Sequence, residues 1–156
     1  MQLACSIPDN VSDEAAAFGM LGIIAMHGVR CADLTFGSKV VVIGLGLLGL
    51  LTIQILKAYG CYVMGIDLDK TKVALAKTLN IDFVTDSAAE LEQHITNKTA
   101  THGVDASILT LASQSAKPVS DAITFTRERG KIVVVGTADI HPDRNELWRK
   151  EIELPF

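Results

Sequence analysis

A glycine-rich loop between two apolar segments is the feature of this sequence that most constrains its fold. The loop reads Gly44-Leu45-Gly46-Leu47-Leu48-Gly49 and follows residues 40–43, a β-branched run typical of a strand. Residues 50–59 are apolar on most sides, which predicts a buried helix that ends at Gly60. A strand, a G-x-G-x-x-G loop and a helix in this order form the opening unit of a nucleotide-binding α/β sheet.

Each part of the loop has a separate expected role. Gly44 permits a tight turn, Gly46 lets a dinucleotide pyrophosphate approach the backbone, and Gly49 lets the helix pack closely on the sheet. The free amides at the start of the helix, those of Leu47 and Leu48, and the positive end of the helix dipole would hold the pyrophosphate. The sequence therefore predicts a dinucleotide site that needs no lysine in the loop.

An acidic residue, Asp67, ends the next predicted strand, residues 61–66. It lies 18 positions after Gly49. This is close to the spacing of about 20 at which the fingerprint places the carboxylate that accepts hydrogen bonds from the adenosine ribose. Its charge would repel a 2′-phosphate, so NAD is favoured over NADP, although Lys70 and Lys72 follow. The other interpretation of Asp67 is a helix N-cap, a role that Asp69 fills equally well.

The rest of the chain alternates strands with helices. Further strands are predicted at residues 82–84, 104–109, 131–135 and 148–154, and helices at residues 15–30, 70–79, 88–96 and 118–127. This order predicts an α/β fold: a Rossmann, doubly wound parallel sheet of about six strands with helices on both faces.

Charge and cysteine content exclude several classes of function. The net charge of -4 and the scattered Lys and Arg residues predict neither a nucleic-acid interface nor a membrane patch. The three cysteines and four histidines show no metal-ligand spacing. We therefore expect reduced thiols, no metal site within this chain and a cytoplasmic location.

Several stretches resemble the medium-chain dehydrogenase/reductase superfamily, which includes the zinc-type alcohol dehydrogenases. Residues 7–16 resemble the entry into its cofactor domain, residues 40–49 and 65–69 its dinucleotide site, and residues 130–136 its fifth strand. A narrower resemblance, in residues 22–30 and 41–50, is to bi-domain oxidoreductases. These proteins join a medium-chain dehydrogenase half to a glucose-fructose oxidoreductase-like half.

The resemblance implies further site residues. Lys72 would contact the adenosine ribose, although a solvated lysine on a helix face is an equal interpretation. Thr110 would lie near the nicotinamide side, and Gly136 and Thr137 would flank the nicotinamide. Residues 113–115 follow the fourth predicted strand, where ligands bind in this fold, but capping of their own loop is the preferred interpretation.

The resemblance also implies how the chain is organised. Residues 1–30 would be a helical lead-in from a catalytic domain outside this chain, and residues 31–156 the NAD(P)-binding domain. Residues 18–24, where the family carries its catalytic-zinc cysteine, contain none. We therefore expect neither zinc ligands nor catalytic residues here, and a chain that is part of a longer protein.

The resulting hypothesis is the NAD(H)-binding domain of an alcohol dehydrogenase-like oxidoreductase, which moves a hydride to or from an alcohol or carbonyl, with sugar derivatives among the candidate substrates. One alternative is a non-catalytic NAD-sensing module. Another is an S-adenosylmethionine-dependent methyltransferase, which the third glycine, Gly49, disfavours. Leu147 and Trp148 fit equally well a place in the core or a homodimer contact.

Overall fold

The computed structural model describes residues 5–138 and 142–155. Its centre is a parallel sheet of five strands in the order β3-β2-β1-β4-β5. The chain builds outward from β1 in one direction and then returns to build outward from its other side, which is the doubly wound arrangement. The strands are β1 Lys39–Ile43, β2 Tyr62–Ile66, β3 Phe83–Thr85, β4 Val104–Leu109 and β5 Thr126–Val134.

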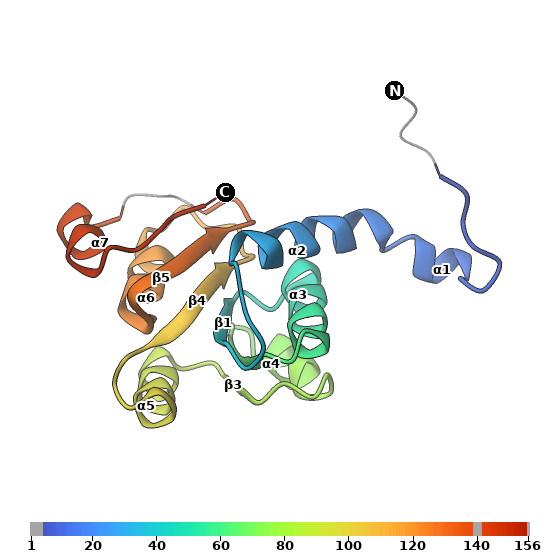
Figure 1. Ribbon diagram of the computed structural model, residues 1–156. Helices are drawn as coiled ribbons and strands as arrows, with labels where there is room; N and C mark the ends of the chain where they lie inside the picture. The colour runs from blue at the N-terminus through green and yellow to red at the C-terminus, as the bar shows by residue number, and fades with distance from the viewer. Residues whose placement is uncertain (1–4, 139–141, 156) are drawn as a thin grey trace.

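Helices cover both faces of the sheet, which confirms the predicted fold class (Figure 1). Because side chains alternate along a strand, Val40 and Val42 of β1 face one layer, while Val41 and Ile43 face the other. The first layer is α2 Gly19–Cys31, α3 Leu47–Ala58 and α4 Lys70–Lys77. The second layer is α5 Ala88–Thr99, α6 Lys117–Phe125 and α7 Arg144–Lys150.

The predicted helix at residues 15–30 is wrong in one respect, because it forms two helices rather than one. Ser12 caps α1 Asp13–Ala16 by accepting a hydrogen bond from the Ala15 amide at 3.2 Å. The helical ladder then breaks at Phe18, whose amide bonds to the Ala15 carbonyl in a tighter turn. Neither α1 nor the first turns of α2 contain a buried residue, so packing does not hold them in one continuous helix.

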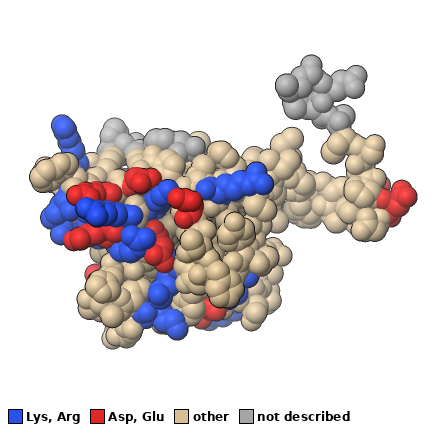
Figure 2. Space-filling view, viewed as in Figure 1, with Lys and Arg blue, Asp and Glu red and all other residues tan. Residues whose placement is uncertain are grey.

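The second half of α2 packs against the body of the domain. Ala25, Gly28 and Val29 are buried there, and a Cβ on Gly28 would lie 2.5 Å from Val135 Cγ2. The first half projects away together with α1 (Figure 1), and Figure 2 shows this arm as almost free of charged side chains up to its tip. Whether residues 1–30 form a unit separate from 31–156 stays a prediction, and residues 1–4, 139–141 and 156 lie outside the described residues.

The predicted sixth strand at residues 148–154 is also wrong. Asp143 begins α7 by accepting hydrogen bonds from the Asn145 and Glu146 amides, and this cap favours a helix through Lys150. After α7, residues 153–155 run beside β5, where the Ile132 amide donates to the Glu153 carbonyl and the Glu153 amide donates to the Gly130 carbonyl. They form an isolated bridge rather than a strand, so the described part of the sheet has five strands instead of about six. In α7, Trp148 is 82% exposed.

Two further boundaries differ from those predicted. The last strand begins at Thr126 rather than residue 131, so residues 126–127, predicted as the end of a helix, belong to β5. α5 runs to Thr99, beyond the predicted end at residue 96, and buries Leu91 and Ile95 against the sheet. No helix among the described residues is long and apolar enough to cross a membrane.

The packing around His94 predicts a pH dependence of stability. Its ring stacks on Phe83 with centroids 3.8 Å apart, and its Nε2 lies 3.1 Å from the Tyr62 hydroxyl. Burial lowers the pKa of His94 below its ordinary value of 6.5, the charge of Lys98 lowers it further, and Glu90 opposes both. Because the folded-state pKa is the lower one, the stability that neutral His94 contributes is complete above pH 6.5 and is lost as pH falls through the folded-state pKa.

Urea unfolding measured between about pH 5 and 8 tests this expectation. The variant His94→Phe should flatten the decline of the unfolding free energy below pH 6.5, the ordinary histidine value. The matched variant His102→Gln, which changes an exposed histidine, should leave that decline as in the wild type. An equal decline in His94→Phe and the wild type would contradict the assignment.

Candidate functional site

A cleft of about 490 Å³ lies at the carboxyl edge of the sheet, beside the ends of β1, β2 and β4. The strand order reverses between β1 and β4, and ligands of open α/β sheets bind outside the strand ends at such a switch point. Five of the predicted site residues line it: Gly44, Gly46, Asp67, Lys72 and Thr110. Leu47, Leu48 and Gly49 form the adjoining first turn of α3.

The three loop glycines occupy three different environments. Gly44 has a φ of +98°, a conformation that favours glycine, and a Cβ there would lie 2.7 Å from the Leu111 Cβ. A Cβ on Gly49 would lie 2.0 Å from the Gly44 carbonyl oxygen, so only glycine allows α3 to approach the loop this closely. A Cβ on Gly46 would meet nothing within 4 Å, because this residue faces open space.

The start of α3, which adjoins the cleft at Gly46, has free hydrogen-bond donors. Gly46 is its N-cap and has no side chain to accept from the first-turn amides. The first intrahelical bond, from the Leu50 amide to the Gly46 carbonyl, leaves the amides of Leu47 and Leu48 without helical partners. Such an end, with the positive pole of the helix dipole, suits an anion that can approach without meeting a side chain.

The Asp67 carboxylate is fixed by the surrounding backbone. It accepts a hydrogen bond from the Leu45 amide at 2.8 Å and another from the Asp69 amide at 2.9 Å. Lys72 Nζ lies 3.5 Å from Asp67 Oδ2, and the Asp67 side chain is only 12% exposed. Ionised carboxylate oxygens have several acceptor positions, so Asp67 retains acceptor capacity toward the cleft.

Asp69, and not Asp67, is the N-cap of α4. Its carboxylate accepts hydrogen bonds from the Thr71 hydroxyl and the Thr71 amide, and these hold the pKa of Asp69 below its usual value. The capping interpretation of Asp67 is therefore wrong, and its carboxylate serves the glycine loop instead.

The remaining predicted residues follow β4 and β5. Thr110 donates its hydroxyl to the Gly44 carbonyl at 2.7 Å. Gly136 packs closely against Leu111, which follows Thr110 in the loop after β4. A Cβ on Gly136 would lie 2.1 Å from the Leu111 carbonyl oxygen. Gly136 and Thr137 are adjacent to this loop but are not among the described residues that line the cleft.

Sequence reasoning missed part of the cleft wall. Leu68, 88% exposed beside Asp67, lines it together with Leu111, and Lys117 and Asp121 of α6 form an ion pair of 2.9 Å on the same wall. The rule that ligands bind where parallel strands end could have identified Leu68 and Leu111, which are the second residues after β2 and β4. The α6 residues became neighbours only through the fold.

The loop after β4 combines the two roles considered for it. The Ser113 hydroxyl accepts a hydrogen bond from the Ser115 amide at 3.0 Å, and the Ser115 hydroxyl accepts one from the Lys117 amide at 3.2 Å. These bonds confirm the prediction of loop capping. Ser113 and Ser115 also line the cleft.

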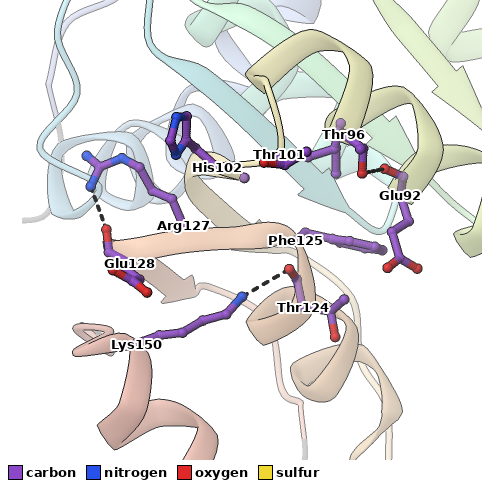
Figure 3. A pocket seen from close by; sticks show the side chains of 11 residues that line it. Glu92, Thr96, Thr101, His102, Thr124, Phe125, Arg127, Glu128 and Lys150 are labelled. Carbon is purple, nitrogen blue, oxygen red and sulfur yellow. Dashed lines mark hydrogen bonds between the residues drawn. The ribbon is translucent and has the colours of Figure 1, made fainter.

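A second cavity, of about 440 Å³, lies near the start of β4 and β5, away from the carboxyl edge (Figure 3). Two cationic side chains that line it, those of Lys150 and Arg127, are hydrogen-bonded within the chain. Lys150 Nζ donates to the carbonyls of Ile123, Thr124 and Thr126, at 2.6, 3.1 and 2.8 Å, and so joins α7 to the end of α6. Arg127 donates to Asp105 at 2.8 Å. These contacts give Lys150 and Arg127 structural roles.

The described residues do not provide a metal site. Within residues 5–138 and 142–155, no three His, Cys, Asp or Glu side chains gather closely enough to hold an ion. Cys61 is buried, and burial raises the pKa of its thiol, which keeps it protonated and a poor ligand. The described residues therefore do not fit a zinc ion.

Comparison with known proteins identifies the family. A family model described as zinc-binding dehydrogenase matches residues 48–154. Alcohol dehydrogenase from Geobacillus stearothermophilus is 35% identical over 135 residues, which cover 83% of this chain and 38% of that protein. Sorbitol dehydrogenase from Homo sapiens is 30% identical over 132 residues, which cover 83% of this chain and 37% of that protein.

A solved structure shows the same architecture. Acetophenone reductase from Geotrichum candidum, in complex with NAD, superposes with a TM-score of 0.78 at 27% identity, over 96% of this chain and 42% of that one. The chain thus spans well under half the length of the relatives it matches. From the family match and the shared architecture, this chain belongs to the zinc-binding dehydrogenases, within the medium-chain dehydrogenase superfamily.

Proposed function

We propose that this chain is the NAD(H)-binding domain of an alcohol dehydrogenase-like oxidoreductase. The observation that carries the proposal is the place of Asp67, whose fixed carboxylate lines the same cleft as the open loop before α3. A carboxylate for ribose hydroxyls beside free amides for a pyrophosphate is the pair of groups that a dinucleotide requires. Family membership adds support, since it groups the chain with dehydrogenases rather than methyltransferases.

The residues fit the cofactor part by part. The amides of Leu47 and Leu48 would bind the pyrophosphate, which approaches past Gly46, where a side chain is lacking and the space is open. Asp67 and Lys72 would bind the adenosine ribose, and the exposed Leu68 would pack against the base.

The nicotinamide side would lie toward the ends of β4 and β5. Thr110 lines the cleft there, and Gly136 and Thr137 follow β5 beside the loop that Thr110 begins. A bound nicotinamide supplies a hydride donor or acceptor. The contribution of this chain would be to bind and orient that group, and we assign no proton transfer to its residues.

The same geometry favours NAD over NADP. Asp67 would place a negative charge at the ribose hydroxyls, where NADP carries its 2′-phosphate. Lys72 is already within 3.5 Å of Asp67, so its charge is partly neutralised and offers little to a second anion. We further propose that the whole protein acts in the cytoplasm on an alcohol or carbonyl, with polyols and sugar derivatives as the candidate class, as the name of the sorbitol dehydrogenase relative suggests.

Calorimetric titration with NAD⁺, NADH, NADP⁺ and S-adenosylmethionine tests the proposal. NAD⁺ and NADH should bind, and NADP⁺ should bind at least about tenfold more weakly, because repulsion of about 1–2 kcal/mol at the ribose opposes it. S-adenosylmethionine serves as the comparison ligand of similar size and should not bind. Preference for S-adenosylmethionine, or binding of neither dinucleotide, would overturn the proposal.

A further inference from the structure

The peptide unit that joins Gly44 to Leu45 is held at both of its polar ends. The Gly44 carbonyl accepts a hydrogen bond from Thr110 Oγ1 at 2.7 Å, and the Leu45 amide donates one to Asp67 Oδ2 at 2.8 Å. The C=O and N–H of a trans peptide point in opposite directions, so the two contacts grip this peptide from opposite sides. Thr110, which provides the first hydrogen bond, is the residue after β4, and Asp67, which provides the second, is the residue after β2.

The backbone at Gly44 restrains the orientation of this peptide only weakly. Gly44, at a φ of +98°, lacks the Cβ that would restrict its backbone, so the chain there has alternative peptide orientations of low cost. The orientation of the Gly44–Leu45 peptide sets the course of the chain into Gly46 and the first turn of α3. A rotated peptide would therefore redirect the amides of Leu47 and Leu48.

The contact with Thr110 is close-packed as well as polar. A Cβ on Gly49 would lie 2.9 Å from Thr110 Oγ1 and 2.0 Å from the Gly44 carbonyl oxygen, so the hydroxyl, the carbonyl and the helix meet with no spare room. A hydroxyl has a single proton, and the Gly44 carbonyl at 2.7 Å is a closer acceptor for that of Thr110 than the Ile43 carbonyl at 3.4 Å. Its donor capacity is thus used within the protein.

We propose that Thr110 is a positioning residue, which with Asp67 clamps the Gly44–Leu45 peptide so that the amides opening α3 face the pyrophosphate of a dinucleotide. The inference rests on the proposed function and assigns to Thr110 a role in phosphate binding that is separate from any contact with the nicotinamide. Because Asp67 belongs both to this clamp and to the ribose site, the clamp also links these two parts of the cleft.

Three variants separate the clamp from general packing. Thr110→Val keeps the shape but removes the donor, and Thr110→Ser restores it. The matched control Thr52→Val removes another buried hydroxyl, which donates to the Leu48 carbonyl at 2.8 Å within α3 rather than to the Gly44–Leu45 peptide. Affinities for NADH, ADP and adenosine are measured on each protein by calorimetry and by chemical-shift titration of the ¹⁵N-labelled chain.

Thr110→Val should weaken NADH and ADP about tenfold, because the buried carbonyl loses its partner and the loop loses its orientation. Adenosine, which carries no phosphate, should bind as to the wild type. Thr110→Ser and Thr52→Val should both stay within about twofold of the wild type for all three ligands. Without ligand, hydrogen exchange of the Leu45 amide should be faster in Thr110→Val than in Thr110→Ser, and Thr110→Ala provides the same comparison if valine impairs folding.

Other results overturn the inference in distinguishable ways. NADH affinity and Leu45 exchange that are unchanged in Thr110→Val would remove the clamp and leave the dinucleotide site in place. An equal loss of affinity for adenosine and ADP would show a general packing defect and would also overturn it. A wild-type chain that binds neither NADH nor ADP would instead overturn the proposed function, and this inference with it.

Discussion

Gly49→Ala is expected to lower the free energy of unfolding by about 3 kcal/mol and to abolish NADH binding. The added Cβ would lie 2.0 Å from the Gly44 carbonyl oxygen and 2.9 Å from Thr110 Oγ1. Neither atom can move away at low energetic cost, because the Gly44 oxygen belongs to the backbone and Thr110 Oγ1 is hydrogen-bonded to that oxygen. Either α3 must move away from β1 or the loop must change its path, and both displace the amides that would bind the pyrophosphate.

Urea unfolding and NADH titration of Gly49→Ala measure the two effects, and two other glycines supply matched controls. Gly22→Ala adds a Cβ that meets nothing within 4 Å in α2, so the unfolding free energy should rise by about 0.5–1 kcal/mol. Gly46→Ala also adds a Cβ in open space, and its cost to stability should stay within about 1 kcal/mol. Its NADH affinity should nevertheless be lost, because the methyl group would occupy the approach of the pyrophosphate.

This contrast between Gly49 and Gly46 separates a packing glycine from a binding glycine. A Gly49→Ala protein as stable as the wild type would contradict the close approach of α3 to the loop. Full NADH affinity in Gly46→Ala would place the pyrophosphate elsewhere.

Asp67→Ala is expected to weaken NADH binding by roughly 100-fold or more. Hydrogen bonds to a charged group contribute about 1.5–3 kcal/mol each, and this substitution removes those to the ribose together with the one that holds the Leu45 amide. The preference for NADH over NADPH should shrink at the same time, because the negative charge that repels a 2′-phosphate is gone. Titration of the variant with both reduced cofactors measures the two effects.

Asp69→Ala is the matched control for Asp67→Ala. It removes the same charge two positions away, where the carboxylate caps α4 and accepts from the Thr71 amide at 2.8 Å. Its loss should lower the unfolding free energy by about 1 kcal/mol and leave NADH affinity and cofactor preference near those of the wild type. Equal NADH affinities in the two variants would show that Asp67 does not contact the ribose.

The agreement between sequence and structure is best where the information is local. The β-branched run, the glycine loop and the apolar segment after it are consecutive, and they form β1, the turn and α3 as predicted. Alternation of strands and helices was sufficient to predict a doubly wound parallel sheet. The loop and Asp67 both line one cleft, because parallel strands end at the same edge.

Local patterns were insufficient where packing or capping decided the outcome. Residues 148–154 have apolar positions compatible with a strand, but the Asp143 cap and the three carbonyls that hold Lys150 make α7 a helix. The helix predicted at residues 15–30 breaks at Phe18, where no neighbouring element supports it. For α7 the deciding contacts involve residues outside the predicted segment. For the first helix, the packing that would have kept it continuous is missing.

The sequence by itself determined the order of elements from β1 to β5, the doubly wound sheet and the position of the glycine loop before α3, because each follows from the spacing of neighbouring residues. Only the tertiary structure decided what Thr110 and Asp67 do. Their bonds to Gly44 and Leu45 join residues 66 and 22 positions apart, and such contacts exist only once β2 and β4 flank β1. Hydrogen bonding acts over about 3 Å, so its partners depend on which strands become neighbours and not on distance along the chain.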